Sequence, residues 1–488
     1  MTEIRFVDQT LRDGQQSLWG LRMRAYQAMP VLENIDRTGF HAVDMTGAGM
    51  FAVLMRTFRD DPWETVDHLA RGLRNSHLRT ATRTISVGGM GFAPDSVVDL
   101  WITCMARHGI DSFWILDCLL DLPRMRRIAD VVTAAGAAPV PAVMYGLTDV
   151  HTDEWFAVRA AEMARWPGVE AVYVEDAAGI LTPERARTLL PALVRAVDGV
   201  PIELHCHTNT GLAPQVYLEG VRAGIDILHT ASRPLANGPS LPSTEATVDN
   251  IVALGHTHAL DSTRFDPVAE RLEHEARTAG YEIGAPSEYS VRPFDHQLPG
   301  GMTGSLKSQL AQYGMEDRLD EVLAEIPRVR RELGHPIMAT PFSQIVGIQA
   351  VCNVVTGRRY EVIPDEVVHY ALGHYGPVAG VLDPEVADRV LESPRGRRLA
   401  NWERPQPTLR ELRAQLGATL TDDELLLRAL FSAEEVDAVK AAGPVPTTSP
   451  TSLARVVDQL AQVSGVRARA VSISGSGYQI TLRRGTTS

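Results

Sequence analysis

Cysteine is scarce in this chain, and acidic residues outnumber basic ones. The four cysteines among 488 residues, Cys104, Cys118, Cys206 and Cys352, show no paired spacing. They give neither a disulfide framework nor a zinc-finger pattern, which is typical of proteins in a reducing compartment. The formal net charge of -13 argues against a protein that binds nucleic acid or an anionic membrane, because either partner needs a basic surface.

Long apolar runs, internal repeats and low-complexity segments are missing as well. No stretch approaches the roughly eighteen apolar residues of a membrane-spanning helix. The start, Met1-Thr-Glu-Ile-Arg5, lacks the basic and then apolar order of a signal peptide. We therefore expect a cytoplasmic protein that spans no membrane. Its length predicts one large domain with one or two smaller ones.

Short apolar runs alternate with longer amphipathic stretches over the first half of the chain. Eight of these runs are predicted strands: Ile4–Asp8, His41–Met45, Thr80–Ile85, Ser112–Asp117, Val140–Tyr145, Ala171–Glu175, Ile202–His207 and Ile227–Ala231. Between them, Pro62–Leu73 and Pro183–Val197 are predicted helices, because each starts with proline behind a capping residue, Asp61 or Thr182. Eight strand–helix units predict an α/β protein with a (β/α)8 TIM barrel over residues 1–260. The count alone leaves an open, doubly wound sheet as the alternative.

Helical patterns dominate after residue 260. We expect a helical, funnel-like appendage over 261–400, a charged helical extension over 401–442, and a linker with a small αββ tail over 443–488. Gly443-Pro-Val-Pro-Thr-Thr-Ser-Pro450 indicates the linker by its composition. The tail is predicted to hold a helix at Leu453–Val463 and a hairpin of Arg469–Ile473 and Gln479–Arg483.

Two histidines end the seventh predicted strand, in Pro201-Ile-Glu-Leu-His-Cys-His-Thr-Asn-Thr-Gly211. Residues two apart on a strand point to the same side, so the imidazoles of His205 and His207 are predicted to project together. Such a pair supplies half of a metal site. A pair of strand histidines hydrogen-bonded to their neighbours explains the same short motif equally simply.

Carboxylates follow other strands of the same predicted barrel. Asp8-Gln-Thr-Leu-Arg-Asp-Gly-Gln-Gln-Ser17 comes after the first strand, and Glu175 ends the sixth. Two carboxylates and two imidazoles suit a divalent cation, Zn²⁺ or alternatively Mn²⁺ or Co²⁺, that polarises a carbonyl and stabilises an enolate. A solvated loop that caps a helix is the other explanation of the first segment. Arg12 and Arg83 are available for a substrate carboxylate, although a surface salt bridge explains Arg83 as well.

These segments resemble, in their order and spacing, the pyruvate carboxyltransferase family, which includes hydroxymethylglutaryl-CoA lyase and isopropylmalate synthase relatives. Asp8–Ser17, Val174-Glu-Asp-Ala-Ala-Gly179 and His205-Cys-His207 carry the resemblance. Asp295-His-Gln-Leu-Pro-Gly-Gly-Met302 and Gly334-His-Pro-Ile-Met-Ala-Thr-Pro-Phe-Ser-Gln-Ile-Val-Gly347 narrow it to the carboxyltransferase subunits. These are the transcarboxylase 5S subunit, the oxaloacetate decarboxylase α-subunit and the pyruvate carboxylase transferase domain. The resemblance implies a metal-dependent barrel with a helical funnel that handles the enolate of a 2-oxo acid, pyruvate or oxaloacetate.

The family's functional residues can be carried over by position along roughly residues 4–400. The resemblance makes Asp13, His205 and His207 metal ligands. It makes Arg12, Gln16 and Arg83 the groups that hold pyruvate and its enolate, and Thr303 joins the substrate-binding set. Members are commonly oligomeric, so a homo-oligomer is expected.

The chain also departs from the family pattern. The family has a lysine that becomes carboxylated and ligates the metal, and this chain has Glu175 in its place. The side chain of Glu175 is shorter, so it ligates the metal directly only if the metal or the strand shifts. Alternatively, it acts through a water. The hydroxyl residue that shuttles a proton to and from biotin is replaced by Gly304, between Thr303 and Ser305. An aspartate and a tyrosine of pyruvate carboxylase align with Ala52 and Met90. No Ala-Met-Lys-Met biotinylation sequence occurs, so any biotin is expected on a separate carrier chain.

Three hypotheses follow for the function. The first is a metal-dependent carboxyltransferase or decarboxylase that acts through the enolate of a 2-oxo acid. The second is a biotin-independent aldolase, lyase or Claisen-type condensing enzyme, which differs in its dependence on biotin or CoA. The third is a non-catalytic scaffold subunit, which binds no metal or is unaffected by His207→Ala.

Overall fold

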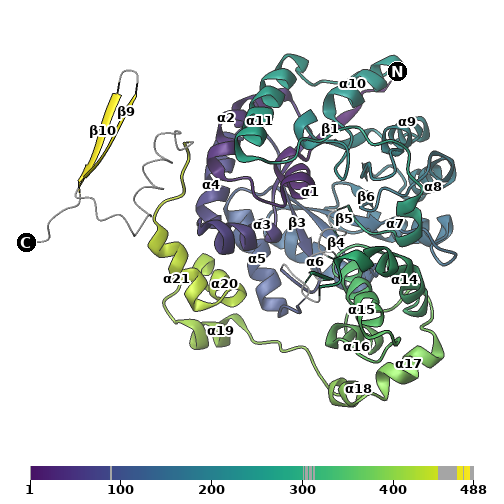
Figure 1. Ribbon diagram of the computed structural model, residues 1–488. Helices are drawn as coiled ribbons and strands as arrows, with labels where there is room; N and C mark the ends of the chain where they lie inside the picture. Colours follow the sequence, from purple (N-terminus) through teal and green to yellow (C-terminus); the bar gives the residue numbers. More distant parts are fainter. Residues whose placement is uncertain are drawn as a thin grey trace, which may run out of the picture. The chain divides into compact units, whose positions relative to one another are not determined.

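The computed structural model describes residues 2–87, 91–300, 302, 306, 310–311 and 314–448, and the backbone of 470–475 and 478–483 (Figure 1). The chain forms two compact units, Met1–Val445 and Pro446–Ser488. Within the second unit, β9 (Ala470–Gly475) and β10 (Tyr478–Arg483) pair antiparallel, as the predicted hairpin requires. The helix predicted at Leu453–Val463 lies outside the described residues.

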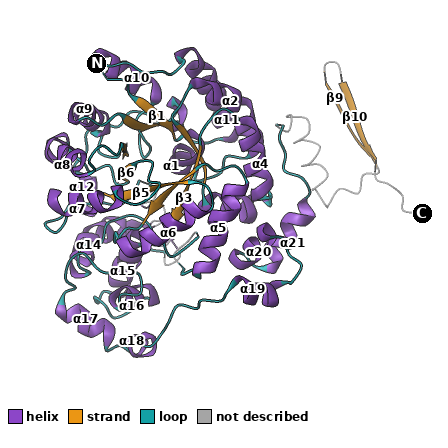
Figure 2. Ribbon diagram, turned by 180° about the vertical axis from the view of Figure 1, so that it is seen from behind, coloured by secondary structure: helices purple, strands orange, loops and turns teal. Residues whose placement is uncertain are grey.

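Eight parallel strands close into a barrel at the centre of the first unit, and helices surround it (Figure 2). Hydrogen bonds between β1 and β8 complete the closure, which confirms the (β/α)8 barrel and excludes the open sheet. The strands are β1 (Arg5–Asp8), β2 (Ala42–Thr46), β3 (Leu78–Arg83), β4 (Ser112–Leu116), β5 (Ala138–Met144), β6 (Val172–Asp176), β7 (Ile202–Cys206) and β8 (Ile227–Thr230). All eight correspond to predicted runs. The fifth begins at Ala138, two residues before the predicted run, because the prediction treats Pro139 as the end of the preceding loop.

The helices between the strands begin largely where the capping signals place them. Asp61 accepts hydrogen bonds from the backbone of Trp63 and Glu64, and Thr182 accepts one from Arg185. The outer layer consists of α2 (Ala25–Thr38), α4 (Pro62–Gly72), α5 (Asp95–Arg107), α6 (Leu122–Ala134), α7 (Asp153–Ala164), α8 (Pro183–Ala196), α9 (Ala213–Ala223) and α10 (Thr244–Ala253). Short helices α1 (Gln15–Trp19) and α3 (Ala48–Val53) follow β1 and β2.

A helical region continues from the barrel, as the sequence predicts. It contains α11 (Phe265–Ala279), α12 (Arg292–His296), α14 (Leu319–Glu332), α15 (Phe342–Thr356), α16 (Asp365–Ala371), α17 (Pro384–Leu391) and α18 (Pro394–Leu399). None of the helices in the described part of the chain is both long and apolar enough to cross a membrane.

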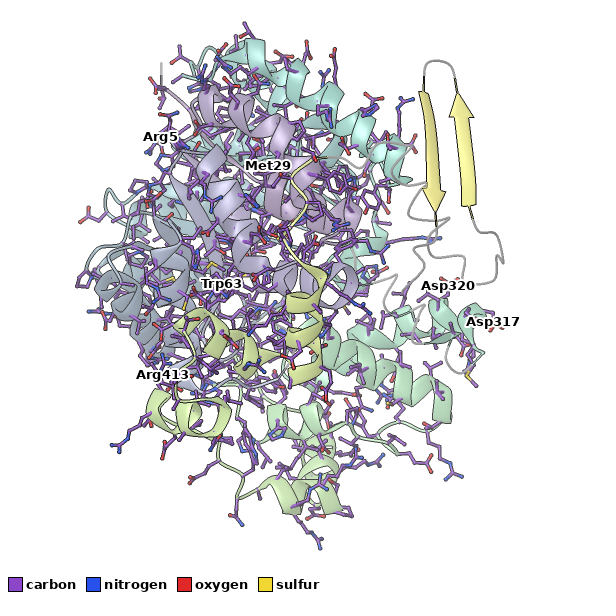
Figure 3. The ribbon with its side chains drawn as sticks, turned by 90° about the vertical axis from the view of Figure 1, so that its left-hand side faces the viewer. Arg5, Met29, Trp63, Asp317, Asp320 and Arg413 are labelled. Carbon is purple, nitrogen blue, oxygen red and sulfur yellow. The ribbon has the colours of Figure 1, made fainter. Side chains whose placement is uncertain are left out.

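The last three helices of this unit, α19 (Leu409–Leu416), α20 (Asp422–Leu430) and α21 (Ala433–Ala442), return to the barrel beside α4 and α5. Arg107 of α5 contacts Asp422 and Asp423 at 2.8 and 2.9 Å, although 315 residues separate Arg107 from Asp422. Trp63 of α4 donates to the carbonyl oxygen of Asp423 at 3.2 Å. Trp63 and Arg413, which pairs with Asp422, mark this junction in Figure 3.

The interior of the barrel is unusually polar. Branched apolar side chains normally fill a barrel of this kind. Here the strand residues Val7, Ala42 and Ile227 form a small apolar cluster apart from the main core. Arg79 and Glu203 are fully buried in the same barrel, and the functional residues lie beyond them at the carboxyl ends of the strands.

Candidate metal centre

Three predicted ligands, Asp13, His205 and His207, lie together in a buried cluster. The Nε2 atom of His205 is 3.5 Å from Oδ2 of Asp13, and Nε2 of His207 is 3.5 Å from Oδ1. The two Nε2 atoms lie 3.2 Å apart. Among the described residues, this is the one group of three or more such side chains close enough to share a cation.

The chain delivers these ligands from the carboxyl ends of two strands, β1 and β7, which have β8 between them. His205 lies on β7, and His207 follows the strand, so the alternation along a strand gives both the same direction. Asp13 belongs to a single π-helical turn, η1 (Thr10–Gly14), directly after β1. That turn packs closely on the loop after β8, because a Cβ at Gly14 would lie only 2.8 Å from the carbonyl oxygen of Leu235.

In each histidine, Nδ1 contacts another protein group and Nε2 faces Asp13. Nδ1 of His207 donates to the carbonyl oxygen of Pro239 at 2.6 Å, which leaves Nε2 as the ligating atom. Nδ1 of His205 is 2.6 Å from the hydroxyl of Tyr173. Metal-binding histidines characteristically engage the second ring nitrogen in this way, so the donor set fits a divalent cation.

The electrostatics of the cluster favour a bound positive charge. Burial raises the pKa of Asp13, but Arg12 and His207 outweigh it and hold that pKa well below its usual value. Burial lowers the pKa of His207, but the Asp13 carboxylate raises it to about 9. The carboxylate is therefore ionised at neutral pH.

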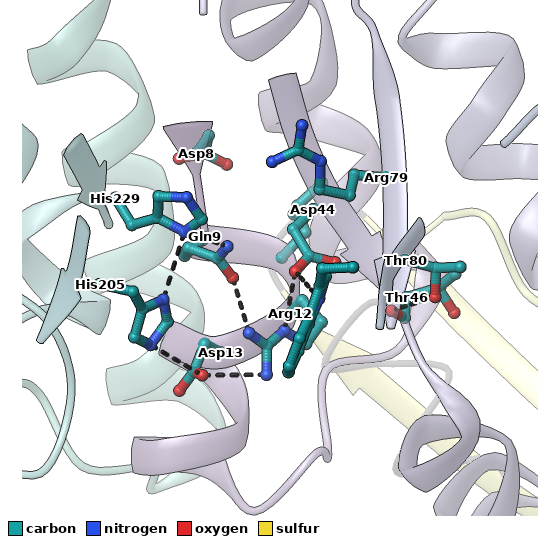
Figure 4. A network of polar contacts seen from close by, with 12 residues as sticks. Asp8, Gln9, Arg12, Asp13, Asp44, Thr46, Arg79, Thr80, His205 and His229 are labelled. Atoms are coloured by element: carbon teal, nitrogen blue, oxygen red, sulfur yellow. Dashed lines mark hydrogen bonds and ion pairs between the residues drawn. The ribbon is translucent and has the colours of Figure 1, made fainter. Parts of the chain in front are cut away.

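Arg12 is the centre of the polar network in Figure 4. Its Nη1 lies 2.9 Å from Asp13, its Nε donates to Asp44 at 3.1 Å, and its Nη2 donates to Gln9 at 3.0 Å. The guanidinium also lies over the ring of Trp114, 5.0 Å from the centroid. Such multiple contacts fix its orientation beside the ligand cluster.

Glu175 faces the same site without joining the three-residue cluster. It lies on β6, paired in register with His205, and it is buried. Burial raises its pKa to about 7 despite the opposing effect of Arg12. Its Oε2 atom is buried and has no hydrogen-bond partner among the described residues. The carboxylate can therefore accept a contact from a ligand or a water.

The predicted substrate-binding residues are distributed around the cluster. Gln16 is exposed on α1, whereas the neighbouring Gln15 is buried and bonded to the backbone of Leu11 and Met23. Arg83 lines a pocket of about 270 Å³ at the carboxyl ends of β3 and β4. That pocket is also lined by Thr84, Asp117, Cys118, Thr340, Phe342 and Tyr375, among others. Thr303, Gly304 and Met90 lie outside the described residues.

Gln9, Asp44 and His229 belong to the network but were not predicted as site residues, although Gln9 and His229 carry a signal. Gln9 lies inside the Asp8–Ser17 motif, and His229 is an isolated titratable residue in a buried apolar strand. The side-chain amide of Gln9 lies 3.0 Å from Nδ1 of His229. Nδ1 of His229 in turn lies 3.2 Å from Nδ1 of His205.

Comparison with known proteins gives consistent results. An HMGL-like family model matches residues 3–269, and a model of a conserved carboxylase domain matches residues 294–485. The chain is 35% identical over 391 residues to a pyruvate carboxylase subunit of Methanocaldococcus jannaschii, covering 80% of this chain and 68% of that protein. It is 32% identical over 450 residues to the 2-oxoglutarate carboxylase large subunit of Hydrogenobacter thermophilus, covering 89% and 68%.

A third relative and one solved structure extend the comparison. The methylmalonyl-CoA carboxyltransferase 5S subunit of Propionibacterium freudenreichii is 30% identical, with 88% of this chain and 86% of that protein covered. The carboxyl transferase domain of Rhizobium etli pyruvate carboxylase, solved with pyruvate, superposes with a TM-score of 0.82 at 24% identity. That superposition covers 99% of this chain and 83% of that domain, and it demonstrates a shared fold.

Proposed function

The chain belongs to the HMGL-like family and carries the conserved carboxylase domain, and from this premise we propose that it transfers or releases a carboxyl group through the enolate of a 2-oxo acid. It is a metal-dependent enzyme of the carboxyltransferase class. The observation that carries the proposal is the buried cluster of Asp13, His205 and His207 beside the guanidinium of Arg12.

The ligand cluster and Arg12 have complementary tasks in this reaction. Asp13, His205 and His207 hold a divalent cation, Zn²⁺ or alternatively Mn²⁺ or Co²⁺. When bound, the cation supplies Lewis acidity toward the carbonyl oxygen of the substrate. Arg12 is positioned by four contacts and places a permanent positive charge where negative charge develops on the substrate. Burial of these groups strengthens each electrostatic effect because water is excluded.

The substrate is proposed to be pyruvate or oxaloacetate, held by Arg12, Gln16, Arg83 and Thr303. The relatives named above act, by their names, on pyruvate, 2-oxoglutarate or methylmalonyl-CoA. Guanidinium groups recognise carboxylates through paired hydrogen bonds, which suits Arg83 in the pocket next to Glu175. The carboxyl group is proposed to move to or from biotin on a separate carrier chain, because several of these relatives are named as subunits.

Glu175 is proposed to place a second carboxylate beside the residues that would hold the cation. Its carboxylate lies outside the three-residue cluster but faces Arg12, Asp13 and His207 electrostatically. Its Oε2 atom has no partner in the part of the chain that the structure describes, which supports a role as an acceptor in the site. We further propose that the protein works in the cytoplasm, where its four unpaired cysteines remain reduced, and that it forms a homo-oligomer.

Exchange of the pyruvate methyl protons with deuterium tests the proposed chemistry. The exchange is followed by NMR in D₂O on protein of assayed metal content. We expect exchange in the wild type, loss of exchange and of bound metal in His207→Ala, and unchanged exchange in His274→Ala, whose side chain is exposed on α11. A wild type that binds no metal and exchanges no protons contradicts the proposal.

Decarboxylation of oxaloacetate in the presence and absence of free biotin separates the two catalytic hypotheses. Acceleration by biotin is expected of a carboxyltransferase. Proton exchange without any effect of biotin would instead favour the aldolase, lyase or condensing reaction. The departures at Glu175 and Gly304 make this second reaction worth testing.

A further inference from the structure

A buried row of polar side chains runs through the barrel to His205. Arg79, Glu203 and His229 are each fully buried. Arg79 donates to Oε2 of Glu203, and the same oxygen lies 2.9 Å from Nε2 of His229. His229 then reaches His205 at 3.2 Å (Figure 4). Burying charged groups in this way is costly, so the row needs an explanation beyond packing.

The Nδ1 side of His229 is fixed through Gln9 by Arg12, a residue that can only donate. Arg12 donates from Nη2 to Oε1 of Gln9 at 3.0 Å. A guanidinium has no acceptor, so the carbonyl oxygen of Gln9 must face Arg12 and its NH₂ group must face the other way. That NH₂ group lies 3.0 Å from Nδ1 of His229 and donates to it. Nδ1 of His229 therefore carries a lone pair and no proton.

The Nε2 side of His229 is fixed by Glu203, a residue that can only accept. Glu203 is ionised against the buried guanidinium of Arg79, and its Oε2 accepts from that guanidinium. The same atom accepts the proton of His229 from Nε2 at 2.9 Å. The contacts at both ring nitrogens therefore indicate the same tautomer of His229, with the proton on Nε2.

We infer that Gln9, His229 and Glu203 act as positioning residues that set which nitrogen of His205 faces the cation. Two ring nitrogens with lone pairs repel each other at 3.2 Å, so His205 must carry its proton on Nδ1 opposite the lone pair of His229. Nδ1 of His205 also lies 2.6 Å from the hydroxyl of Tyr173, whose oxygen can accept from it. Nε2 of His205 is then bare and faces Asp13 and His207. The inference rests on the proposed function, since the ligand is the cation proposed there.

The row orients His205 and does not conduct protons. Glu170, partly exposed to solvent, lies 3.5 Å from Arg79, so the row does extend toward the opposite end of the barrel. A proton that entered there would have to cross Arg79, and a guanidinium does not release its proton in a protein. Orientation of His205 is the role that remains.

Two nearly isosteric variants separate this inference from simple electrostatics. In Gln9→Glu, a carboxylate would accept from both Arg12 and His229, which forces a proton onto Nδ1 of His229 and removes the acceptor for His205. We expect Zn²⁺ affinity, measured by competition with a chelator, to fall about 10- to 100-fold. An added negative charge would by itself tighten cation binding, so tighter or unchanged binding overturns the inference.

Glu203→Gln changes the charge of the row but not the tautomer of His229. It removes a charge but keeps an oxygen that can accept from both Arg79 and His229, so the tautomer is preserved. We expect Zn²⁺ affinity to stay within a few-fold of the wild type, even though loss of the Glu203 charge beside Arg79 lowers the melting temperature. Should Glu203→Gln fail to fold, the result for Gln9→Glu still decides.

The tautomers can be observed directly by NMR on the metal-free, full-length protein labelled with ¹⁵N-histidine. We expect His229 as the Nε2–H form and His205 as the Nδ1–H form, assigned by the loss of signals in His229→Gln and His205→Gln. A His205 protonated only on Nε2 overturns the inference. A wild type that shows the expected tautomers but binds no Zn²⁺ would instead contradict the proposed function.

Discussion

The carbonyl oxygen of His207 lies 2.6 Å from the position that a Cβ atom would occupy at Gly179. The next contact of that position is the backbone nitrogen of Asn209 at 3.0 Å. Gly179 also has a φ of +65°, in the region that favours glycine. The turn after β6 can therefore approach the turn after β7 only because residue 179 has no side chain.

Gly179→Ala is expected to weaken metal binding by displacing the backbone of His207. We expect Zn²⁺ affinity to drop about tenfold or more, as for other changes that misorient a ligand. The matched control is Gly136→Ala, because Gly136 also has a positive φ, +84°, but no atom within 4 Å of its Cβ position. Equal effects of the two variants on metal affinity would show that backbone strain, and not the clash with His207, is responsible.

Arg12→Lys is expected to reduce pyruvate proton exchange by a factor of about 10² or more. An ammonium group cannot contact Asp13, Asp44 and Gln9 at once, nor stack over Trp114 as a planar guanidinium does. Arg24→Lys serves as the control, since Arg24 makes a forked contact with Asp60 at 2.7 and 2.8 Å outside the ligand cluster. Equal losses in both variants would point to a general loss of stability, which thermal unfolding measures.

The fold could be predicted because eight short strand-like runs alternate with amphipathic stretches, some of which begin at recognisable caps such as Asp61 and Thr182. The ligand cluster could be predicted because strand ends of a closed parallel barrel meet at one face, which brings Asp13 to His205. The contact of Gln9 with His229 could not be predicted, because it joins side chains 220 residues apart across the closure of β1 against β8 and leaves no local pattern. The contact of Arg107 with Asp422 spans 315 residues and likewise leaves no local pattern.

Asp8→Asn is expected to stabilise the protein more at alkaline than at acidic pH. Burial raises the pKa of Asp8 to about 7. Hydrogen bonds from Thr10 lower this pKa, and the nearby charge of Glu245 raises it. A carboxyl whose pKa is higher in the folded state loses stabilising protonation as the pH rises from about 4 to about 7. The advantage of Asp8→Asn should grow by about 2–3 kcal/mol between pH 5 and pH 8. Unfolding in denaturant at both pH values measures it, and parallel stability curves would contradict the prediction.

Glu175→Gln is expected to weaken Zn²⁺ binding about 10- to 100-fold while leaving the fold intact. The reason is that Gln retains the volume of Glu175 but not the negative charge that faces the cation cluster, and Oε2 of Glu175 has no protein partner to lose among the described residues. Glu245→Gln is the matched control. Glu245 is also a mostly buried carboxylate with a raised pKa, and its Oε2 likewise has no partner among the residues that the structure describes, but it lies beside Asp8 and Ser232 instead. Chelator competition measures both affinities. Unchanged Zn²⁺ affinity in Glu175→Gln would mean that the cation is held by Asp13, His205 and His207 alone, and that Glu175 serves the substrate through Arg83.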